Sequence, residues 1–366
     1  KDFYSSYEDL QIEKDINLFK QFVSSFSKKY NGKILEFFQN FDDVILEFED
    51  GCEISAKLEC YAFLIYATNM NDSKIVQFYQ KISEEMTEIS GDLIFFTNTI
   101  NNFSDKDFEK ILTNTIKYKS WLINIRRFSK HQLSEESERI LLDKSMTANS
   151  SWVRFFEEKI NDLKFLIDNK EVNSSEALNL LTDQDGSIRK KASESIGSVF
   201  KANAKIFTFI TNTLAKDKII NDKWRNYANP VDSRNLANNI EGDVVEALSN
   251  SVQNHYLKIS HRYYKLKSKI FNKDKLNFWD RNAPYPDSTN KKISWKEAQN
   301  IVLKSYGDFD SELEQIAQLF FDKNWIDAEL KEGKSPGAFS ASTIPSIHPY
   351  ILMNYHGKTR DVMTLA

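Results

Sequence analysis

Residues that break helices are scarce in this chain of 366 residues, which holds only 10 glycines and 6 prolines. No proline occurs before Pro230, and five of the six lie between Pro284 and Pro349. Because proline lacks an N–H group and clashes with the preceding helical turn, its absence permits long helices before that position. Irregular backbone, which often carries function, is therefore expected near the C-terminal end.

Cysteine, long apolar runs and a strong net charge are also lacking, and each absence excludes a class of protein. Two cysteines, Cys52 and Cys60, cannot form a disulfide framework and indicate a reducing compartment, which predicts a cytoplasmic protein. No stretch approaches the roughly 20 apolar residues that span a bilayer, and the polar start contains no apolar core of a signal peptide. The formal net charge of −4 argues against a general nucleic-acid binder.

Helical periodicity dominates what the sequence does contain. Apolar residues recur every three or four positions, as they do on one face of a helix. The clearest runs are 12–30, 58–66 and 75–86, and Ser104, Ser134 and Ser174 are expected caps of further helices. Longer amphipathic helices are predicted over 185–223 and 238–271, followed by helices near 295–305 and 309–324. The sequence therefore predicts a mainly α-helical fold built of multi-helix lobes.

The C-terminal tail changes character and predicts a small β-sheet near that end. Residues 334–342 are rich in turn formers, Tyr350–Tyr355 is an apolar run of strand length, and Asp361–Ala366 has the pattern of a beginning helix. Residues 272–292 have the composition of a linker loop. The short apolar run Leu163–Ile167 fits either a brief strand or the end of the preceding helix, and periodicity alone does not separate the two.

Several chemical motifs are present only in part. The run Gly333–Gly337 fits the G-x-S-x-G pattern of serine hydrolases, but that elbow needs an N–H group where Pro336 stands. The two Gly-Lys-Ser/Thr triplets in the tail lack the preceding glycine of a phosphate loop. No two of the five histidines are four residues apart, so His348 and His356 are more simply structural than metal ligands. The locally basic run His261–Lys267 does not by itself support nucleic-acid binding.

Three runs in the C-terminal tail are specific enough to be compared with a known family. The runs Gly333–Ser340, His348–Tyr355 and Asp361–Ala366 closely resemble oligoendopeptidase F and its relatives, which are helical zinc oligopeptidases of the thimet-oligopeptidase type. Two upstream blocks, Trp279–Pro284 and Tyr227–Arg234, are similar to the same family. The resemblance covers essentially the whole chain in order. It implies an N-terminal helical region over residues 1–185 and the first part of a catalytic domain over residues 186–366.

The resemblance implies a zinc-dependent endopeptidase that hydrolyses short oligopeptides inside a helical channel. In that family, the H-E-x-x-H helix follows directly after the motif that ends here at Ala366. We therefore expect zinc in the complete protein but none bound to this chain alone, which by itself is expected to be inactive. The expected partners are short peptides and the C-terminal part of the family, with no nucleic acid and no membrane.

The substrate-binding residues that the resemblance implies are Gly337, Ala338, Phe339 and Ser340, which correspond to an active-site edge strand. An edge strand can pair with an extended peptide, and Tyr350–Tyr355 is the expected inner strand that supports it. Two alternatives remain open. In the first, the pair of strands is only a structural hairpin. In the second, the chain is a non-catalytic helical module that binds peptides or a partner. We also expect exposed apolar surface around Ile351, Met353 and Leu365.

Overall fold

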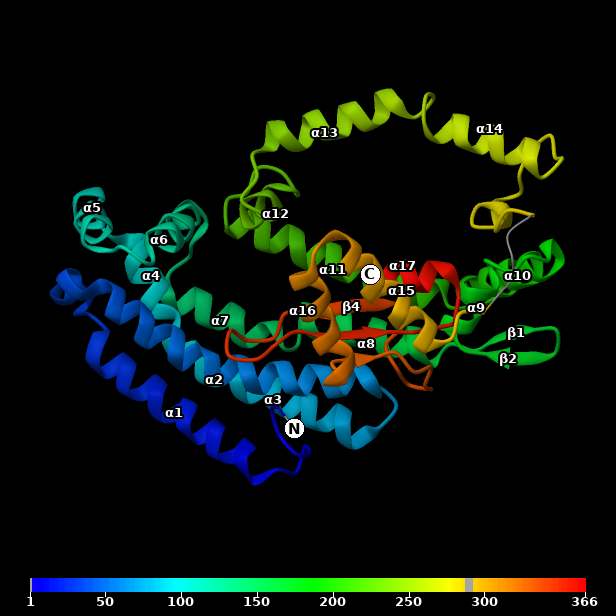
Figure 1. The fold of residues 1–366 in the computed structure, drawn as a ribbon. Helices are drawn as coiled ribbons and strands as arrows, with labels where there is room; N and C mark the ends of the chain where they lie inside the picture. The colour runs from blue at the N-terminus through cyan, green and yellow to red at the C-terminus, as the bar shows by residue number, and fades with distance from the viewer. Residues whose placement is uncertain (1, 287–291) are drawn as a thin grey trace. The chain divides into compact units, whose positions relative to one another are not determined.

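The computed structural model describes residues 2–286 and 292–366 (Figure 1). Residues 287–291 of the expected linker loop lie outside this description. The chain forms two compact units, and each unit is assembled from separate segments. The first unit comprises Lys1–Ile65, Lys74–Phe156 and Phe207–Val252, and the second comprises Tyr66–Ser73, Glu157–Ile206 and Gln253–Ala366. The boundary at residues 185 and 186, which follows the family resemblance, stays a prediction.

Helices make up most of both units, and short 3₁₀ helices (η) connect several of them. The helices before the first strand are α1 (Leu10–Tyr30), η1 (Ile34–Asn40), α2 (Phe41–Thr68), α3 (Ser73–Ser90), η2 (Gly91–Leu93), α4 (Ile94–Asn102), α5 (Asp105–Asn114), α6 (Lys119–Arg126), η3 (Ser129–His131), α7 (Glu135–Ser145) and α8 (Asn149–Asp162). The later helices are α9 (Ser174–Leu180), α10 (Gly186–Ala202), α11 (Ala204–Trp224), α12 (Asp232–Ala237), α13 (Gly242–His255), α14 (Ser260–Ile270), η4 (Phe278–Asp280), α15 (Trp295–Phe309), α16 (Ser311–Asp322) and α17 (Thr359–Leu365).

The described strands form two small sheets in the second unit. Strands β1 (Phe165–Ile167) and β2 (Lys170–Val172) form an antiparallel hairpin, which settles the open question at Leu163–Ile167 in favour of a strand. The second sheet has the order β3-β5-β4 and consists of β3 (Ile326–Asp327), β4 (Ala338–Ala341) and β5 (Tyr350–Met353). The prediction of a mainly α-helical fold with a small sheet near the C-terminal end is confirmed.

An aromatic core holds the first unit together. The predicted apolar face of α1 is buried, and Phe26 on it is fully enclosed. The Phe26 ring lies 5.3 Å from the Phe96 ring in an edge-to-face arrangement, and Phe48 lies 4.6 Å from Phe96. Such pairs stabilise a core beyond the area that they bury. The helical period in the sequence identified the α1 face of this core, whereas Phe48 and Phe96 were not predicted.

The core beside the three-stranded sheet is smaller and covers two residues that we expected to be exposed. Met353 of β5 and Leu365 of α17 are both buried, in a cluster with Ala298 and Val302 of α15. The expectation of exposed apolar surface was wrong at these two positions, because α15 packs against α17 and the sheet. Ile351 is partly exposed.

The structure corrects three local expectations. The predicted helix over 185–223 is divided at Asn203, whose side-chain amide donates to the carbonyl of Val199 and so competes with the helical backbone. The predicted helix over 238–271 is divided between α13 and α14. The cap of α9 is Asn173 and not Ser174: the Asn173 side chain accepts from the N–H of Glu176, 2.9 Å away. The caps at Ser104 and Ser134 are confirmed.

No helix in the described part of the chain is long and apolar enough to cross a membrane.

Candidate functional site

Strand β4 forms one edge of the three-stranded sheet. It pairs with β5 on one side, with Phe339 opposite Leu352, and no strand pairs with its other side among the described residues. The N–H of Ile351 donates to the carbonyl of Trp325 on the β3 side of β5. Because backbone groups alternate sides along a strand, Leu352 therefore faces β4 and bonds with Phe339. The N–H and C=O groups of Ala338 and Ser340 consequently point away from the sheet, toward the open edge.

The residues that the sequence predicted to bind substrate lie together at this edge. Ala338 and Ser340 are exposed, Phe339 is half-buried, and Gly337 directly precedes the strand. Gly337 has a φ of +87°, and a Cβ built there would meet no atom within 4 Å. The expected inner strand is β5, which lies between β3 and β4. The strand geometry agrees with the prediction, whereas peptide binding by these residues stays a prediction.

Lys334 anchors the loop that leads into β4. Its side chain is fully buried, and its ammonium group donates to the carboxylate of Asp327 at 2.9 Å and to the carbonyls of Asp327, Glu329 and Met353 at 2.8–3.0 Å. Asn354 donates its side-chain amide to the carbonyl of Gly337 at 3.0 Å. Lys334 is therefore turned into the sheet, which explains why the Gly-Lys-Ser triplet does not form a phosphate loop.

Replacing Lys334 with methionine is expected to lower the free energy of unfolding by about 2 kcal/mol. The variant leaves three carbonyls without their donor, whereas the partly exposed Asp327 can still be hydrated. Chemical denaturation of the wild type and the variant measures this loss. Lys331→Met is the control, because its exposed ion pair with Glu329 contributes little, and a change of about 0.5 kcal/mol or less is expected there. Equal effects of both substitutions would contradict the anchoring role of Lys334.

A cavity of about 300 Å³ opens beside the first residues of β4. Its walls come from α9, the loop before β4, the end of β5 and the start of α17. His356 lies in this wall with its Nε2 atom 3.2 Å from the hydroxyl of Ser175. Burial lowers the pKa of His356 below its ordinary value, so the neutral imidazole is favoured at pH 7. Lys358 donates to the carbonyl of Asn179 at 3.0 Å, and burial lowers its pKa as well.

The two histidines of the tail make contacts that are typical of structural residues. The ring of His348 stacks on Trp325 at 3.4 Å with an angle of 13° between the rings. His356 pairs with Ser175 as described above. Within residues 2–286 and 292–366, no group of three or more His, Cys, Asp or Glu side chains could hold a metal ion. The described residues of this chain therefore do not form a zinc site.

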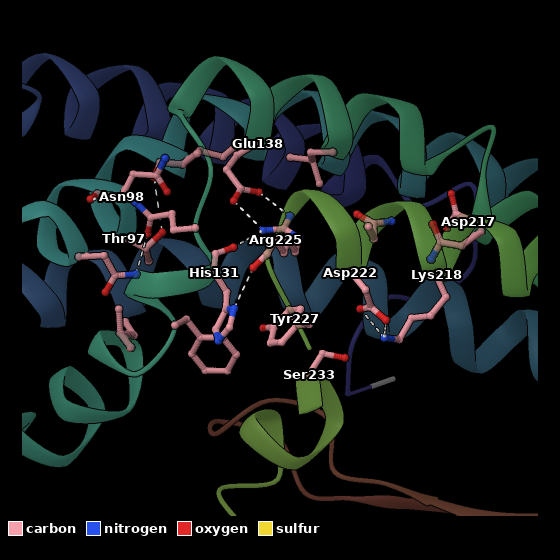
Figure 2. A pocket seen from close by; sticks show the side chains of 18 of the residues that line it. Thr97, Asn98, His131, Glu138, Asp217, Lys218, Asp222, Arg225, Tyr227 and Ser233 are labelled. Carbon is pink, nitrogen blue, oxygen red and sulfur yellow. Dashed lines mark hydrogen bonds and ion pairs between the residues drawn. The ribbon is translucent and has the colours of Figure 1, made fainter. Parts of the chain in front are cut away.

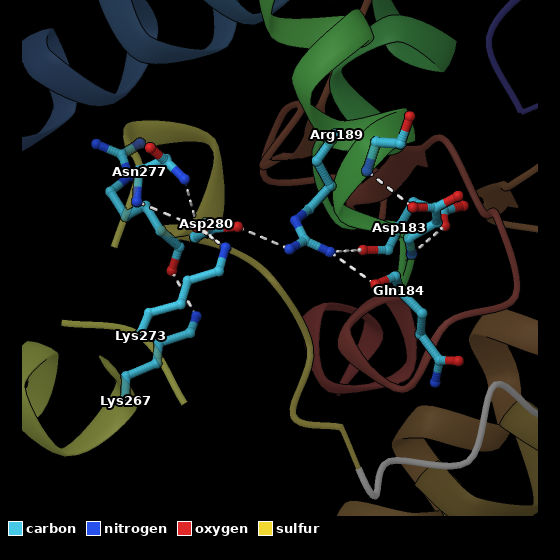
Figure 3. A network of polar contacts seen from close by, with 10 residues as sticks. Asp183, Gln184, Arg189, Lys267, Lys273, Asn277 and Asp280 are labelled. Atoms are coloured by element: carbon cyan, nitrogen blue, oxygen red, sulfur yellow. Dashed lines mark hydrogen bonds and ion pairs between the residues drawn. The ribbon is translucent and has the colours of Figure 1, made fainter. Parts of the chain in front are cut away.

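A buried ionic network joins α10 to the loop that contains Trp279–Pro284 (Figure 3). Asp280 is completely buried; it accepts from Arg189 at 2.7 Å and from Lys273 at 2.7 Å. Burial raises the pKa of Asp280, but the hydrogen bonds from Lys273 and Arg189 outweigh it and lower the pKa to about 2. Arg189 also donates to the carbonyls of Asp183 and Gln184. The family-like block Trp279–Pro284 thus contains a structural anchor, Asp280.

The first unit contains a separate cavity of about 770 Å³ beside Tyr227–Arg234 (Figure 2). The Tyr227 ring stacks on His131 at 3.9 Å, and the Nδ1 atom of His131 lies 2.8 Å from the carbonyl oxygen of Arg225. Arg225 also forms a two-pronged ion pair with Glu138, at 2.7 Å for each bond. Burial raises the pKa of Glu138, but the hydrogen bond from Arg225 outweighs this effect and lowers it. The charges of Arg225 and Glu138 are therefore paired with each other within the protein.

Sequence reasoning missed Lys334, Arg189 and Arg225 as organising residues. Each contacts residues that the sequence gives no local reason to connect with it: Arg189 and Asp280 are 91 positions apart, and Arg225 and Glu138 are 87 apart. The only available signal was that Asp280 and Arg225 lie within or beside the family-like blocks.

Comparison with known proteins identifies the family. The model of peptidase family M3 matches residues 179–366, and the model described as oligopeptidase F matches residues 100–165. Among curated relatives, oligopeptidase PepF of Bacillus subtilis is 22% identical over 96% of this chain. The oligoendopeptidase F homolog of Borreliella burgdorferi is 28% identical over 93% of it. The chain spans only 53% and 58% of the lengths of these two relatives.

Solved structures with the same fold agree with this result. The crystal structure of oligoendopeptidase-F from Enterococcus faecium superposes with a TM-score of 0.67 at 20% sequence identity. The match covers 86% of this chain and 62% of that one. At this level of identity the likeness shows that the fold is shared.

Proposed function

The chain belongs to peptidase family M3, and from this premise we propose that it forms part of a zinc-dependent endopeptidase that hydrolyses short oligopeptides. The observation that carries the proposal is the open edge of β4, at the residues where the family resemblance implies substrate binding. The exposed backbone groups of Ala338 and Ser340 are spaced to pair with an extended peptide. Folded proteins present few extended segments to such an edge, which favours short and flexible substrates.

The residues around the edge suit the close approach of a second backbone. Gly337 has no side chain to obstruct a peptide, and the methyl group of Ala338 is small. The cavity beside His356 and Lys358 offers room for one substrate side chain next to the first residues of the strand. In this proposal, the edge fixes the direction and register of the peptide backbone, and the cavity contacts its side chain.

The hydrolytic chemistry requires a metal that the described residues do not hold. In zinc peptidases the ion polarises the scissile carbonyl and activates a water molecule. The described residues contain no group of three or more His, Cys, Asp or Glu side chains that could hold this ion. We propose that the zinc ligands and the general base belong to polypeptide outside these 366 residues, and that helices of this chain line the substrate channel. The two free cysteines are compatible with a cytoplasmic location.

The 366-residue chain by itself is expected to retain no stoichiometric zinc and to cleave no peptide. Metal analysis after gel filtration and an assay with an internally quenched peptide measure both properties. Stoichiometric zinc together with turnover would contradict the proposed division of roles. A longer product of the same gene, if it carries an H-E-x-x-H motif, should show both zinc and turnover.

A non-catalytic module that binds peptides or a partner through β4 is the alternative. It shares the exposed edge with the first proposal, so peptide binding alone does not separate the two. The gene sequence beyond the codon for Ala366 does: an H-E-x-x-H motif supports the peptidase, and a stop codon supports the module or a split enzyme.

A further inference from the structure

A second cavity in the second unit lies away from the residues of β4 and is lined by basic and aromatic side chains. It has a volume of about 1140 Å³ and is formed by α10, α14 and the loop 274–282. Tyr264, Phe278 and Trp279 supply its apolar surface, and the Phe278 side chain is 73% exposed. A cavity of this size and composition can hold several atoms of an extended ligand.

The charged side chains in its wall are mostly basic. Lys265, Lys275 and Arg281 line the cavity together with His261, and Asp274 is the single carboxylate. In the part of the chain that the structure describes, the side chains of these five residues form no ion pair or side-chain hydrogen bond. Three cations and one carboxylate leave a net charge of +2 at the wall when His261 is neutral. An anionic ligand would neutralise this charge.

The network of Figure 3 brings further cationic side chains, Arg189, Lys267 and Lys273, to the loop that forms this wall. Arg189 and Lys273 pair with the carboxylate of Asp280, Lys267 is 2% exposed, and Asp183 belongs to the same network. The ammonium group of Lys267 donates to a neutral acceptor, the carbonyl of Arg281, at 2.8 Å. The Nε atom of Arg189 has no hydrogen-bond partner among the described residues.

The charge of Lys267, whose ammonium group bonds a neutral carbonyl, adds to the attraction of the cavity for an anion. The backbone N–H of Asn277, which lines the cavity, donates to Asp280, and Arg281 lines the cavity while its carbonyl holds Lys267. The cavity wall and the network of Figure 3 therefore share the loop 274–282. A negative charge at this wall is screened less than one on an open surface, because protein covers one side of it. Burial and the charge of Arg189 lower the pKa of Lys267, and the charge of Asp280 offsets part of this effect.

We propose that this cavity binds the C-terminal carboxylate of an oligopeptide, with the last side chain against Phe278 and Trp279. The inference rests on the proposed peptide-binding function and specifies which end of the substrate is recognised. A carboxylate suits the cations of the wall, because Arg281 can form two parallel bonds with it and lysine ammonium groups can approach from the side. The aromatic surface beside the cations favours a peptide terminus over a free inorganic anion.

The test compares one short peptide in two forms, with a free C-terminal carboxylate and with a C-terminal amide. Both carry a fluorescent label at the N-terminus, and fluorescence anisotropy measures their binding to the 366-residue chain. We expect the free acid to bind about tenfold more tightly than the amide at low salt, with the difference shrinking as salt is added. In the double variant Lys265→Met/Lys275→Met the preference should fall to about twofold or less.

The matched control is Lys269→Met. Lys269 is exposed and lies on α14, the helix that carries Lys265, but it does not line the cavity. It should keep the tenfold preference, and circular dichroism should show the same helix content for all variants. Equal binding of acid and amide by the wild type overturns the inference, and so does a preference that survives in the double variant. Competition by inorganic phosphate with no acid-over-amide preference would identify a non-specific anion site and also overturns it.

These outcomes are separable from failure of the proposed function. Loss of the acid preference while a longer gene product still cleaves peptides would overturn the carboxylate site alone. Absence of cleavage by a product that carries the zinc motif would overturn the peptidase proposal, whichever peptide form binds.

Discussion

Replacing Asp280 with asparagine is expected to lower the free energy of unfolding of the second unit by about 3–5 kcal/mol. The substitution removes the one carboxylate that compensates Arg189, which is only 2% exposed, and it leaves that guanidinium buried without a counter-charge. An uncompensated buried charge costs far more than the loss of a surface ion pair. Denaturant titration followed by circular dichroism measures the change.

A control and a double substitution make this expectation specific. Asp308→Asn removes an exposed carboxylate that pairs with Lys304, and a change of about 0.5 kcal/mol or less is expected. Arg189→Met should be much less destabilising in the Asp280→Asn background than in the wild type, because the charge that it removes is then already uncompensated. Additive effects of the two substitutions would show that Arg189 and Asp280 do not act as a pair.

The same carboxylate predicts an acid-dependent loss of stability. Its pKa is about 2 in the folded protein, below the ordinary value of 3.8. A depressed folded-state pKa contributes stability that is fully present above the unfolded pKa and is lost as the pH falls toward the folded pKa. The wild type should therefore lose about 2 kcal/mol from this group between pH 4 and pH 2. The Asp280→Asn variant should lack this component, and an unchanged slope in the variant would contradict the assignment.

The sequence allowed prediction of the features that depend on local patterns. The buried face of α1 follows from residues spaced by three and four, and the caps at Ser104 and Ser134 follow from their side chains alone. Strand β3 could not be predicted, since Ile326–Asp327 is two residues long and gives no alternating pattern. The break at Asn203 was missed because asparagine inside a helical pattern becomes a break only when its side chain bonds to the backbone.

In the candidate site, too, some residues could be predicted from the sequence and others could not. The tail motifs placed Ala338 and Ser340 on an edge strand, because the family resemblance carries information that composition does not. Lys334 and Arg189 were missed, because a lysine or arginine in the sequence is normally read as an exposed residue. Their burial depends on acceptors supplied by distant segments, such as Met353 for Lys334 and Asp280 for Arg189. Pairing of this kind is decided by tertiary structure, which one sequence does not reveal.

Proline at Ser340 is expected to lower kcat/KM for peptide hydrolysis by about 100-fold in a gene product that carries the zinc motif. The N–H of Ser340 points away from β5, so its removal leaves the β4–β5 bonds in place and eliminates a donor to an added peptide strand. The proline ring would also obstruct the approach of that strand. Thermal unfolding should change little, which separates this effect from misfolding.

Two neighbouring substitutions make the edge prediction precise. Ser340→Ala keeps the backbone N–H, so its kcat/KM should stay within about twofold of the wild type, because only the backbone is proposed to pair. Ala341→Pro removes an N–H that faces β5, opposite Tyr350, and should instead destabilise the sheet by about 3 kcal/mol. If Ser340→Pro cleaves peptides as fast as Ser340→Ala, the substrate does not add to this edge as a strand. The β4–β5 pair is then only a structural hairpin, since the donor that the peptide was proposed to need can be removed without consequence.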